Sequence, residues 1–272
     1  MSVKILDGAI GTELVARGLA VDEPAWTGRA SLDAPELLAE VHADYAAAGA
    51  TLHTANTFRT QPRVLGRDWS AALEASVRIA RASVPEGHRV LGSMAPIEDC
   101  YRPDRSPGEA ARDDHRLVAE ALASAGCDVL LCETFANGEE ARVAVEEAVR
   151  TGLPVWLSLT AGPFADLHTP EALRKLAARA ISHGVERLLV NCVAASSTLP
   201  YVGAIADLGL EVGVYANAGP RGEGLGWGEH ARGATDAYAT LAGAWIDRGA
   251  TVVGGCCGTG PAHIAMLAER YG

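Results

Sequence analysis

The sequence predicts a (β/α)8 barrel, the TIM barrel. Eight short apolar runs, many of them rich in β-branched residues, alternate with longer stretches that have the composition and spacing of helices. Eight such units in 272 residues fit the usual size of this fold. The main alternative is a doubly wound sheet, which usually has fewer strands and a phosphate-binding glycine turn after the first of them. No such turn follows the first apolar run here.

The individual elements can be placed from their boundary residues. Pro35 suits the first turn of a helix over residues 35–48, and Gly49 suits the position after its last turn. Thr169 begins another helix, which ends before Gly184. The eight strands are expected to begin near Val3, Ala50, Arg89, Asp128, Pro154, Glu186, Glu211 and Ala250.

The chain shows no linker and no low-complexity tract, so we expect residues 1–272 to form a single domain. One glycine-rich segment, residues 222–228, follows a strand but does not open a helix directly. A nucleotide-binding glycine segment would lead directly into a helix, so we interpret residues 222–228 as a flexible loop.

Charge and composition exclude several classes of partner. Hydrophobic residues make up 49% and charged residues 21% of the chain, which is typical of a globular protein. The net charge of −11 argues against binding to nucleic acid or to an anionic membrane. Neither a signal peptide nor a membrane-spanning apolar run is present, so we expect a cytoplasmic location. The sequence carries no signal for an oligomeric state.

The expected strands end in polar or thiol residues, which a buried strand does not need for packing. In a barrel these ends form one rim, where function is found. The rim residues are expected to be Asp7-Gly8, Thr54-Ala55-Asn56-Thr57-Phe58, Gly92-Ser93, Cys132-Glu133-Thr134, Ser158-Leu159-Thr160, Asn191-Cys192, Tyr215-Ala216-Asn217 and Gly254-Gly255-Cys256-Cys257-Gly258.

Three cysteines of this rim predict a zinc site. Cys192 ends the sixth strand and Cys256-Cys257 follows the eighth, with only one strand between them. Three thiolates suit zinc and leave its fourth position open for a substrate. A strained disulfide between the adjacent pair is the alternative, which a cytoplasmic setting disfavours. The remaining cysteines are expected to be small packed side chains: Cys100, Cys127 and Cys132.

Two carboxylates on the same rim are candidates for binding a substrate ammonium group. Asp7 and Glu133 stand at strand ends, where a buried carboxylate is costly unless it is paired. A salt bridge to an arginine or lysine is the structural alternative. The eight histidines form no H-x-H or H-E-x-x-H pair, and no G-x-S-x-G motif occurs, so histidine-ligated zinc hydrolases and serine hydrolases are unsupported.

Over nearly its whole length the chain resembles the homocysteine S-methyltransferase family. The most specific motif is Gly254-Gly255-Cys256-Cys257-Gly258-Thr259-Gly260-Pro261-Ala262-His263-Ile264 with Asn191-Cys192 about 60 residues earlier. Further motifs in the same order are Leu6-Asp7-Gly8-Ala9-Ile10-Gly11-Thr12-Glu13-Leu14, Ala48-Gly49-Ala50, Thr54-Ala55-Asn56-Thr57-Phe58, Gly92-Ser93-Met94-Ala95-Pro96 and Glu133-Thr134-Phe135.

The resemblance implies a (β/α)8 barrel in which the three thiols hold zinc. It also implies that Asp7 and Glu133 bind the homocysteine amino group and that backbone near Gly8 binds the carboxylate. Ser93 and Asn217 are further candidates for substrate binding. The nucleophile would be the zinc-bound substrate thiolate, and no general base is needed at the methyl carbon.

The methyl donor is expected to be an onium compound, whose leaving group departs as a neutral molecule. Aromatic faces would favour such a cation, and the candidates are Trp26, Phe58, Phe135 and Tyr215. The extra tyrosines of the betaine-using branch and a cobalamin domain are both absent. S-methylmethionine is therefore the first expectation and S-adenosylmethionine the second.

Two departures from the family pattern bear on that donor. The usual Tyr-Pro-Asn-Ser-Gly after the seventh strand is Tyr215-Ala216-Asn217-Ala218-Gly219 here, and Arg59 follows Phe58 where the family usually has an uncharged residue. An arginine facing the site would repel a cationic donor. Two alternatives stay open: methyl transfer to another thiol or selenol, such as selenohomocysteine, and a non-catalytic zinc-binding or redox-sensing barrel.

Overall fold

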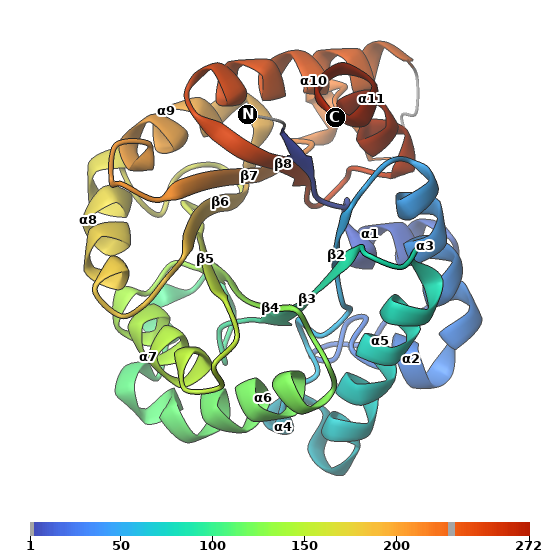
Figure 1. Ribbon diagram of the computed structural model, residues 1–272, viewed down its shortest axis with the longest axis vertical. Coiled ribbons are helices and arrows are strands. Elements are labelled where there is room, and N and C mark those ends of the chain that lie inside the picture. The colour runs from blue at the N-terminus through green and yellow to red at the C-terminus, as the bar shows by residue number, and fades with distance from the viewer. Residues whose placement is uncertain (1–2, 228–231) are drawn as a thin grey trace.

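The computed structural model, which describes residues 3–227 and 232–272, confirms the predicted barrel (Figure 1). Eight parallel strands lie in the order β1-β8-β7-β6-β5-β4-β3-β2, and helices surround them on the outside. An isolated bridge pairs Leu6 with Leu52, and the N–H of Asp7 donates to the carbonyl of Leu52 at 3.0 Å. These contacts join the two outermost strands of the sheet, β1 and β2, so the ring of strands is nearly closed.

The element boundaries agree with the sequence to within two residues at every strand start. The strands are β1 (Lys4–Ile5), β2 (Leu52–Thr54), β3 (Arg89–Met94), β4 (Val129–Phe135), β5 (Val155–Leu159), β6 (Arg187–Ala194), β7 (Glu211–Asn217) and β8 (Ala250–Gly255). The α-helices are α1 (Ile10–Ala16), α2 (Ala30–Asp33), α3 (Pro35–Ala47), α4 (Pro62–Leu65), α5 (Trp69–Ser83), α6 (Arg112–Ser124), α7 (Gly138–Val149), α8 (Pro170–Ile181), α9 (Ala195–Ile205), α10 (Arg232–Asp247) and α11 (Pro261–Tyr271). Short 3-10 turns are η1 (Gly66–Asp68), η2 (Pro103–Arg105), η3 (Gly108–Ala111) and η4 (Arg221–Glu223).

The predicted helix boundary signals act as expected. The hydroxyl of Thr169 accepts a hydrogen bond from the N–H of Ala172 at 3.2 Å, which caps α8. Gly49 and Gly184 follow α3 and α8 with φ of 99° and 95°, a region that glycine enters at little cost. In the glycine-rich segment expected to be a loop, η4 is followed by irregular chain as far as Trp227, and Gly228 lies outside the described residues.

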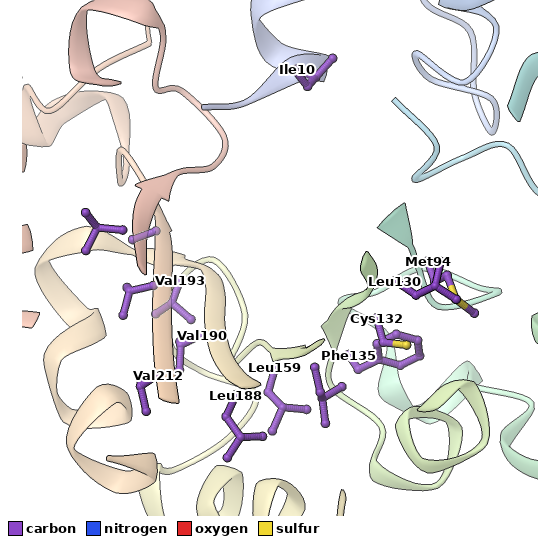
Figure 2. Packing of buried hydrophobic residues seen from close by; sticks show 14 of the residues in the cluster. Ile10, Met94, Leu130, Cys132, Phe135, Leu159, Leu188, Val190, Val193 and Val212 are labelled. Carbon is purple, nitrogen blue, oxygen red and sulfur yellow. The ribbon is translucent and has the colours of Figure 1, made fainter. Parts of the chain in front are cut away.

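Two apolar clusters form the core. One fills the barrel interior and contains Leu6, Leu52, Leu91, Val129, Leu131, Trp156, Leu189, Tyr215 and Val252. The other lies between strands and helices, and Figure 2 shows part of it, including Leu130, Cys132 and Leu188. The alternation between Leu130 and Leu131 places successive side chains of β4 in different clusters, as a strand requires. Within the described residues, no helix is long and apolar enough to span a bilayer.

The layer between α3 and β2 contains two buried histidines. His42 of α3 is fully buried, and neither of its ring nitrogens has a hydrogen-bond partner. His53 of β2 stacks on His88 and has a ring nitrogen 3.0 Å from that of His88. Burial lowers the pKa of His42 to about 3 and that of His53 to about 4. Both rings are therefore neutral at pH 7.

These depressed pKa values make the fold sensitive to acid. Between pH 6.5 and about 4, the unfolded chain binds protons that the folded chain does not, so stability falls as pH falls. Each histidine adds a slope of about 1.4 kcal/mol per pH unit. We expect His42→Leu to reduce the slope of the unfolding free energy by that amount, measured by urea titration at several pH values. Equal slopes in both proteins would contradict this account.

Candidate metal and substrate site

The three cysteines singled out by the sequence meet at the C-terminal end of the barrel. Cys192 lies near the end of β6, and Cys256 and Cys257 follow β8 directly. The Sγ atoms of Cys192 and Cys256 are 2.7 Å apart, and all three sulfurs lie within 4.8 Å of one another. No other group of three metal-ligating side chains this close occurs in residues 3–227 and 232–272. One ion at about 2.3 Å from sulfur could contact all three thiols.

Local backbone conformation turns these thiols toward each other. Cys192 has φ of 53°, and the pairing of β6 with β7 shifts register between Asn191 and Ala194. The Asn191 amide then donates to the Cys192 sulfur at 3.4 Å. A regular strand would send the side chains of residues 191 and 192 to opposite faces, so this irregularity brings Cys192 to the rim.

The adjacent cysteines are held by the strands on both sides of β8. Cys256 donates its N–H to the carbonyl of Ala216 at 2.8 Å, and the carbonyl of Cys257 accepts from Ala218 at 2.9 Å. On the other side, Gly255 donates to the carbonyl of Asp7 at 3.0 Å. The backbone of the pair therefore has little freedom, and its two thiols are fixed relative to β7 and β1.

The three thiols share protons unevenly. Hydrogen bonds from Cys192 and Cys256 lower the pKa of Cys257 well below its ordinary value. The pKa of Cys256 is raised, because its thiol hydrogen-bonds to Cys192 and Cys257 and is buried. One thiolate is thus stabilised by two thiol donors, whereas further ionisation needs a cation among the sulfurs. A soft divalent metal ion fits this set of ligands.

Asp7 presents a buried carboxylate beside the thiols. It is 2% exposed and accepts hydrogen bonds from the N–H and hydroxyl of Thr54 at 2.7 and 3.2 Å. Burial raises the pKa of this carboxyl well above its ordinary value, the Thr54 hydrogen bonds oppose that rise, and the charge of Glu133 adds to it. No arginine or lysine of the described chain forms an ion pair with Asp7, so the salt-bridge alternative does not apply.

Glu133 of β4, like Asp7, is a buried carboxylate that accepts two hydrogen bonds. It is 7% exposed, its Oε1 accepts from the Ser93 hydroxyl, and its Oε2 accepts from the Tyr215 hydroxyl at 2.9 Å. Burial raises its pKa, although both hydrogen bonds oppose the rise. Glu133 also has no cationic side chain as a partner in the described residues. Two buried carboxylates without a counter-ion are suited to a positively charged ligand.

One cavity of about 290 Å³ joins these groups. Its volume is near the lower end of the range for small-molecule sites. The cavity is lined by Asp7, Gly8, Ala9, Ile10, Gly11, Glu23, Trp26, Thr54, Ala55, Asn56, Phe58, Arg59, Ser93, Asp99, Cys100, Tyr101, Glu133, Thr134, Cys192, Tyr215, Gly255, Cys256 and Cys257. Sulfur ligands, carboxylates and aromatic rings therefore face the same space.

Comparison with known proteins agrees with this arrangement. The family model described as homocysteine S-methyltransferase matches residues 4–271. The chain belongs to this family. The homocysteine S-methyltransferase of Escherichia coli (strain K12) is 33% identical, over 98% of this chain and 95% of that protein. A selenocysteine Se-methyltransferase of Brassica oleracea var. italica is 25% identical, over 98% of this chain and 88% of that protein.

A solved structure of the same family has the same fold. The metallated form of the homocysteine methyltransferase MmuM from Escherichia coli superposes with a TM-score of 0.82 at 30% identity, and the match covers 99% of this chain and 96% of that one. The helices and strands described above are therefore those of a homocysteine S-methyltransferase barrel.

Two residues expected in the site lie elsewhere in this family member. Phe135 is fully buried outside the cavity, with its ring 5.8 Å from that of His115. Thr134 has φ of 64°, so β4 stops alternating, and Thr134 instead of Phe135 faces the cavity. Asn217 lines a separate cavity of about 160 Å³ with Phe164 and Trp227 among its neighbours. Phe135 had been expected in the site as an aromatic candidate, and Asn217 as a residue at the end of a strand.

The remaining expected residues line the main cavity, and so do several that sequence reasoning missed. Gly8, Ser93, Trp26, Phe58 and Tyr215 are in the lining as expected. Thr54 and Thr134, which the sequence placed on the rim without a role, are also in the lining, whereas Glu23, Asp99, Cys100 and Tyr101 were not expected there. Cys100 and Tyr101 belong to the irregular chain between β3 and α6, where no periodic pattern indicates direction.

Tyr101 is the most informative of the missed residues. Burial raises the pKa of its hydroxyl, and the charges of Cys192 and Cys257 raise it further. Its phenol therefore stays protonated, and the Tyr101 ring is a further aromatic group in the cavity lining that contains the three thiols.

The close contact between β8 and the following turn gives a test of how rigidly the cysteine pair is held. A Cβ on Gly255 would lie 2.1 Å from Oγ1 of Thr259, whose hydroxyl donates to the carbonyl of Cys256. We expect Gly255→Ala to lower the unfolding free energy by about 1–3 kcal/mol in denaturant titrations. The matched control is Gly222→Ala, because a Cβ there meets no atom within 4 Å. Equal stability of the two variants would show that the turn can relax.

Proposed function

We propose that this chain transfers a methyl group from a sulfonium donor to the sulfur of homocysteine, and that zinc held by Cys192, Cys256 and Cys257 activates the acceptor. The observation that carries the proposal is one cavity lined by three converging thiols and by two buried carboxylates, Asp7 and Glu133, that have no cationic partner among the described residues. A metal store would have no use for these carboxylates, which counts against a non-catalytic zinc-binding or redox-sensing role.

The set of ligands supports zinc. Three cysteine sulfurs, with no fourth protein ligand in the part of the chain that the structure describes, are typical of a site that accepts a substrate sulfur. When bound, the ion lowers the pKa of a coordinated thiol, so that the sulfur is nucleophilic at neutral pH. The similarity to a metallated form of the Escherichia coli enzyme supports a metal at this place.

The carboxylates account for recognition of an amino acid. An ammonium group between Asp7 and Glu133 would relieve the repulsion that contributes to the raised pKa of Asp7. The hydrogen bonds from Thr54, Ser93 and Tyr215 hold both carboxylates in place before substrate arrives. Backbone near Gly8, which lines the same cavity, is where we place the substrate carboxylate.

The methyl transfer itself needs no acid or base from the protein at the carbon. The homocysteine thiol gives up its proton to solvent, and its sulfur lone pair forms the new bond to the methyl carbon. The bond between the methyl carbon and the donor sulfonium breaks, and its electron pair stays on the donor sulfur. With S-methylmethionine as donor, both products are methionine.

Aromatic rings and cavity size favour a small sulfonium. Trp26, Phe58, Tyr101 and Tyr215 line the cavity and offer faces to a cation. A volume of about 290 Å³ suits S-methylmethionine better than the much larger S-adenosylmethionine. A selenol acceptor is the second candidate function, which the 25% identical selenocysteine Se-methyltransferase supports.

The deciding experiment measures methionine formed from homocysteine and each of a panel of donors by the zinc-loaded protein. We expect the highest rate with S-methylmethionine, about one zinc per chain, and loss of both zinc and turnover in Cys256→Ala. Cys127→Ala is the matched control, because Cys127 is buried outside the cavity. Full zinc and turnover in Cys256→Ala would overturn the metal assignment, and a faster rate from betaine or methyltetrahydrofolate would overturn the donor.

A second variant tests the amino-acid pocket. Glu133→Gln keeps the shape and removes the charge that would pair with the substrate ammonium. Loss of a charge-assisted hydrogen bond of about 1.5–3 kcal/mol predicts a fall of about 10- to 150-fold in kcat/KM for homocysteine. Zinc content should not change, and a thiol without an amino group should react as well with the variant as with the wild type. Equal losses with both thiols would show that Glu133 has another role.

Lowering the pH should weaken homocysteine binding in the same way as Glu133→Gln. Because burial raises the pKa of both Asp7 and Glu133, these groups take up protons at a higher pH than ordinary carboxyls. The KM for homocysteine should therefore rise as pH falls, and the rise should be smaller for the thiol that lacks an amino group.

A further inference from the structure

Arg59 is a cation at the main cavity without a matching anion. It lines the cavity, its guanidinium lies 5.3 Å from the centre of the Phe58 ring, and Nη1 donates to the carbonyl of Glu98 at 3.5 Å. Within residues 3–227 and 232–272 it forms no ion pair with a carboxylate. Most of the guanidinium's donors are therefore free to bind an anionic group of a ligand.

The charge of Arg59 acts inside the cavity and not only in solvent. Burial raises the pKa of the Cys100 thiol to about 12, and the positive charge of Arg59 opposes that rise. Cys100 is buried and lines the same cavity. The contact with Glu98 likewise directs the guanidinium toward the chain after β3, which forms one side of the cavity mouth.

Two acidic side chains accompany Arg59 at this mouth. Glu23 and Asp99 line the cavity and are exposed to solvent, whereas Asp7, Glu133 and Cys192 are buried and Cys256 and Cys257 are partly buried. Neither Glu23 nor Asp99 forms an ion pair in the described part of the chain, and the Asp99 carboxylate accepts the N–H of Tyr101 at 2.9 Å. The mouth thus carries one unpaired positive group and two unpaired negative groups.

From this pattern we infer that Arg59 binds the α-carboxylate of the methyl donor, while Glu23 and Asp99 face its α-ammonium group. The inference rests on the proposed function and narrows the donor to a sulfonium that carries an amino-acid end. Such a donor places its sulfonium toward the thiols in the buried part and its zwitterionic end at the mouth. Arg59 then favours a donor that carries a carboxylate, whereas its charge alone suggested that it would repel a cationic donor.

The test is a comparison of Arg59→Gln with the wild type, using S-methylmethionine and its carboxamide as donors. The carboxamide keeps the sulfonium and the ammonium but lacks the carboxylate. A lost charge-assisted contact at a half-exposed site predicts a rise of about tenfold in KM for S-methylmethionine. The KM values for the carboxamide and for homocysteine should stay unchanged, and Arg59→Lys should recover part of the loss. Arg67→Gln is the matched control, because its side chain is 97% exposed and lies outside the cavity.

The outcomes separate this inference from the proposed function. If the wild type makes methionine from S-methylmethionine and Arg59→Gln has the same KM, the inference is wrong and the function stands. If the wild type makes none, the proposed donor is wrong, and calorimetric binding of S-methylmethionine then decides the inference. Binding to the wild type that weakens about tenfold in Arg59→Gln supports it, and no binding to the wild type overturns it.

Discussion

The backbone hydrogen bond between Gly255 of β8 and the carbonyl of Asp7 joins the two halves of the site. It fixes the cysteine pair, which begins one residue after Gly255, relative to the carboxylate of Asp7. The close approach is possible because Gly254 has no side chain. A Cβ at this position would lie 2.8 Å from the backbone oxygen of Asp7. The backbone of the cysteine pair and that of Asp7 are therefore held by the same pairing between β8 and the end of β1.

Uncompensated negative charge is the common property of the groups deep in the cavity. Asp7, Glu133 and Cys192 are buried and Cys256 and Cys257 are partly buried, and no cationic side chain of the described residues balances them. Such an arrangement is unfavourable without ligands, which is why burial raises the pKa of both carboxyls. The metal ion, substrate ammonium and sulfonium that we propose would each supply positive charge at this place. The net negative charge of these groups therefore favours the binding of positively charged ligands.

Among the described residues, Arg59 is the one cationic side chain in the lining of this cavity. It is half-buried, next to Phe58. An arginine deep in the site would pair with Asp7 or Glu133 and abolish the ammonium pocket. At the mouth it leaves the deep negative charge intact and complements a ligand whose own ends carry opposite charges.

The sequence by itself determined the barrel, the strand starts to within two residues, and the set of three thiols. These follow from apolar periodicity and from motifs that are contiguous in the chain, such as Gly254 to Gly258. It also identified Asp7 and Glu133 as unusual, because carboxylates at the ends of apolar strands need a partner.

Only the tertiary structure decided which side chains share the cavity. Left-handed φ values at Thr134 and Cys192 break the alternation of β4 and β6, turning Thr134 inward and leaving Phe135 in the outer core. The irregular chain after β3 brings Tyr101 to the thiols and the backbone of Glu98 to Arg59. Such placements depend on contacts between residues distant in the chain, which the local pattern of apolar and polar residues does not encode.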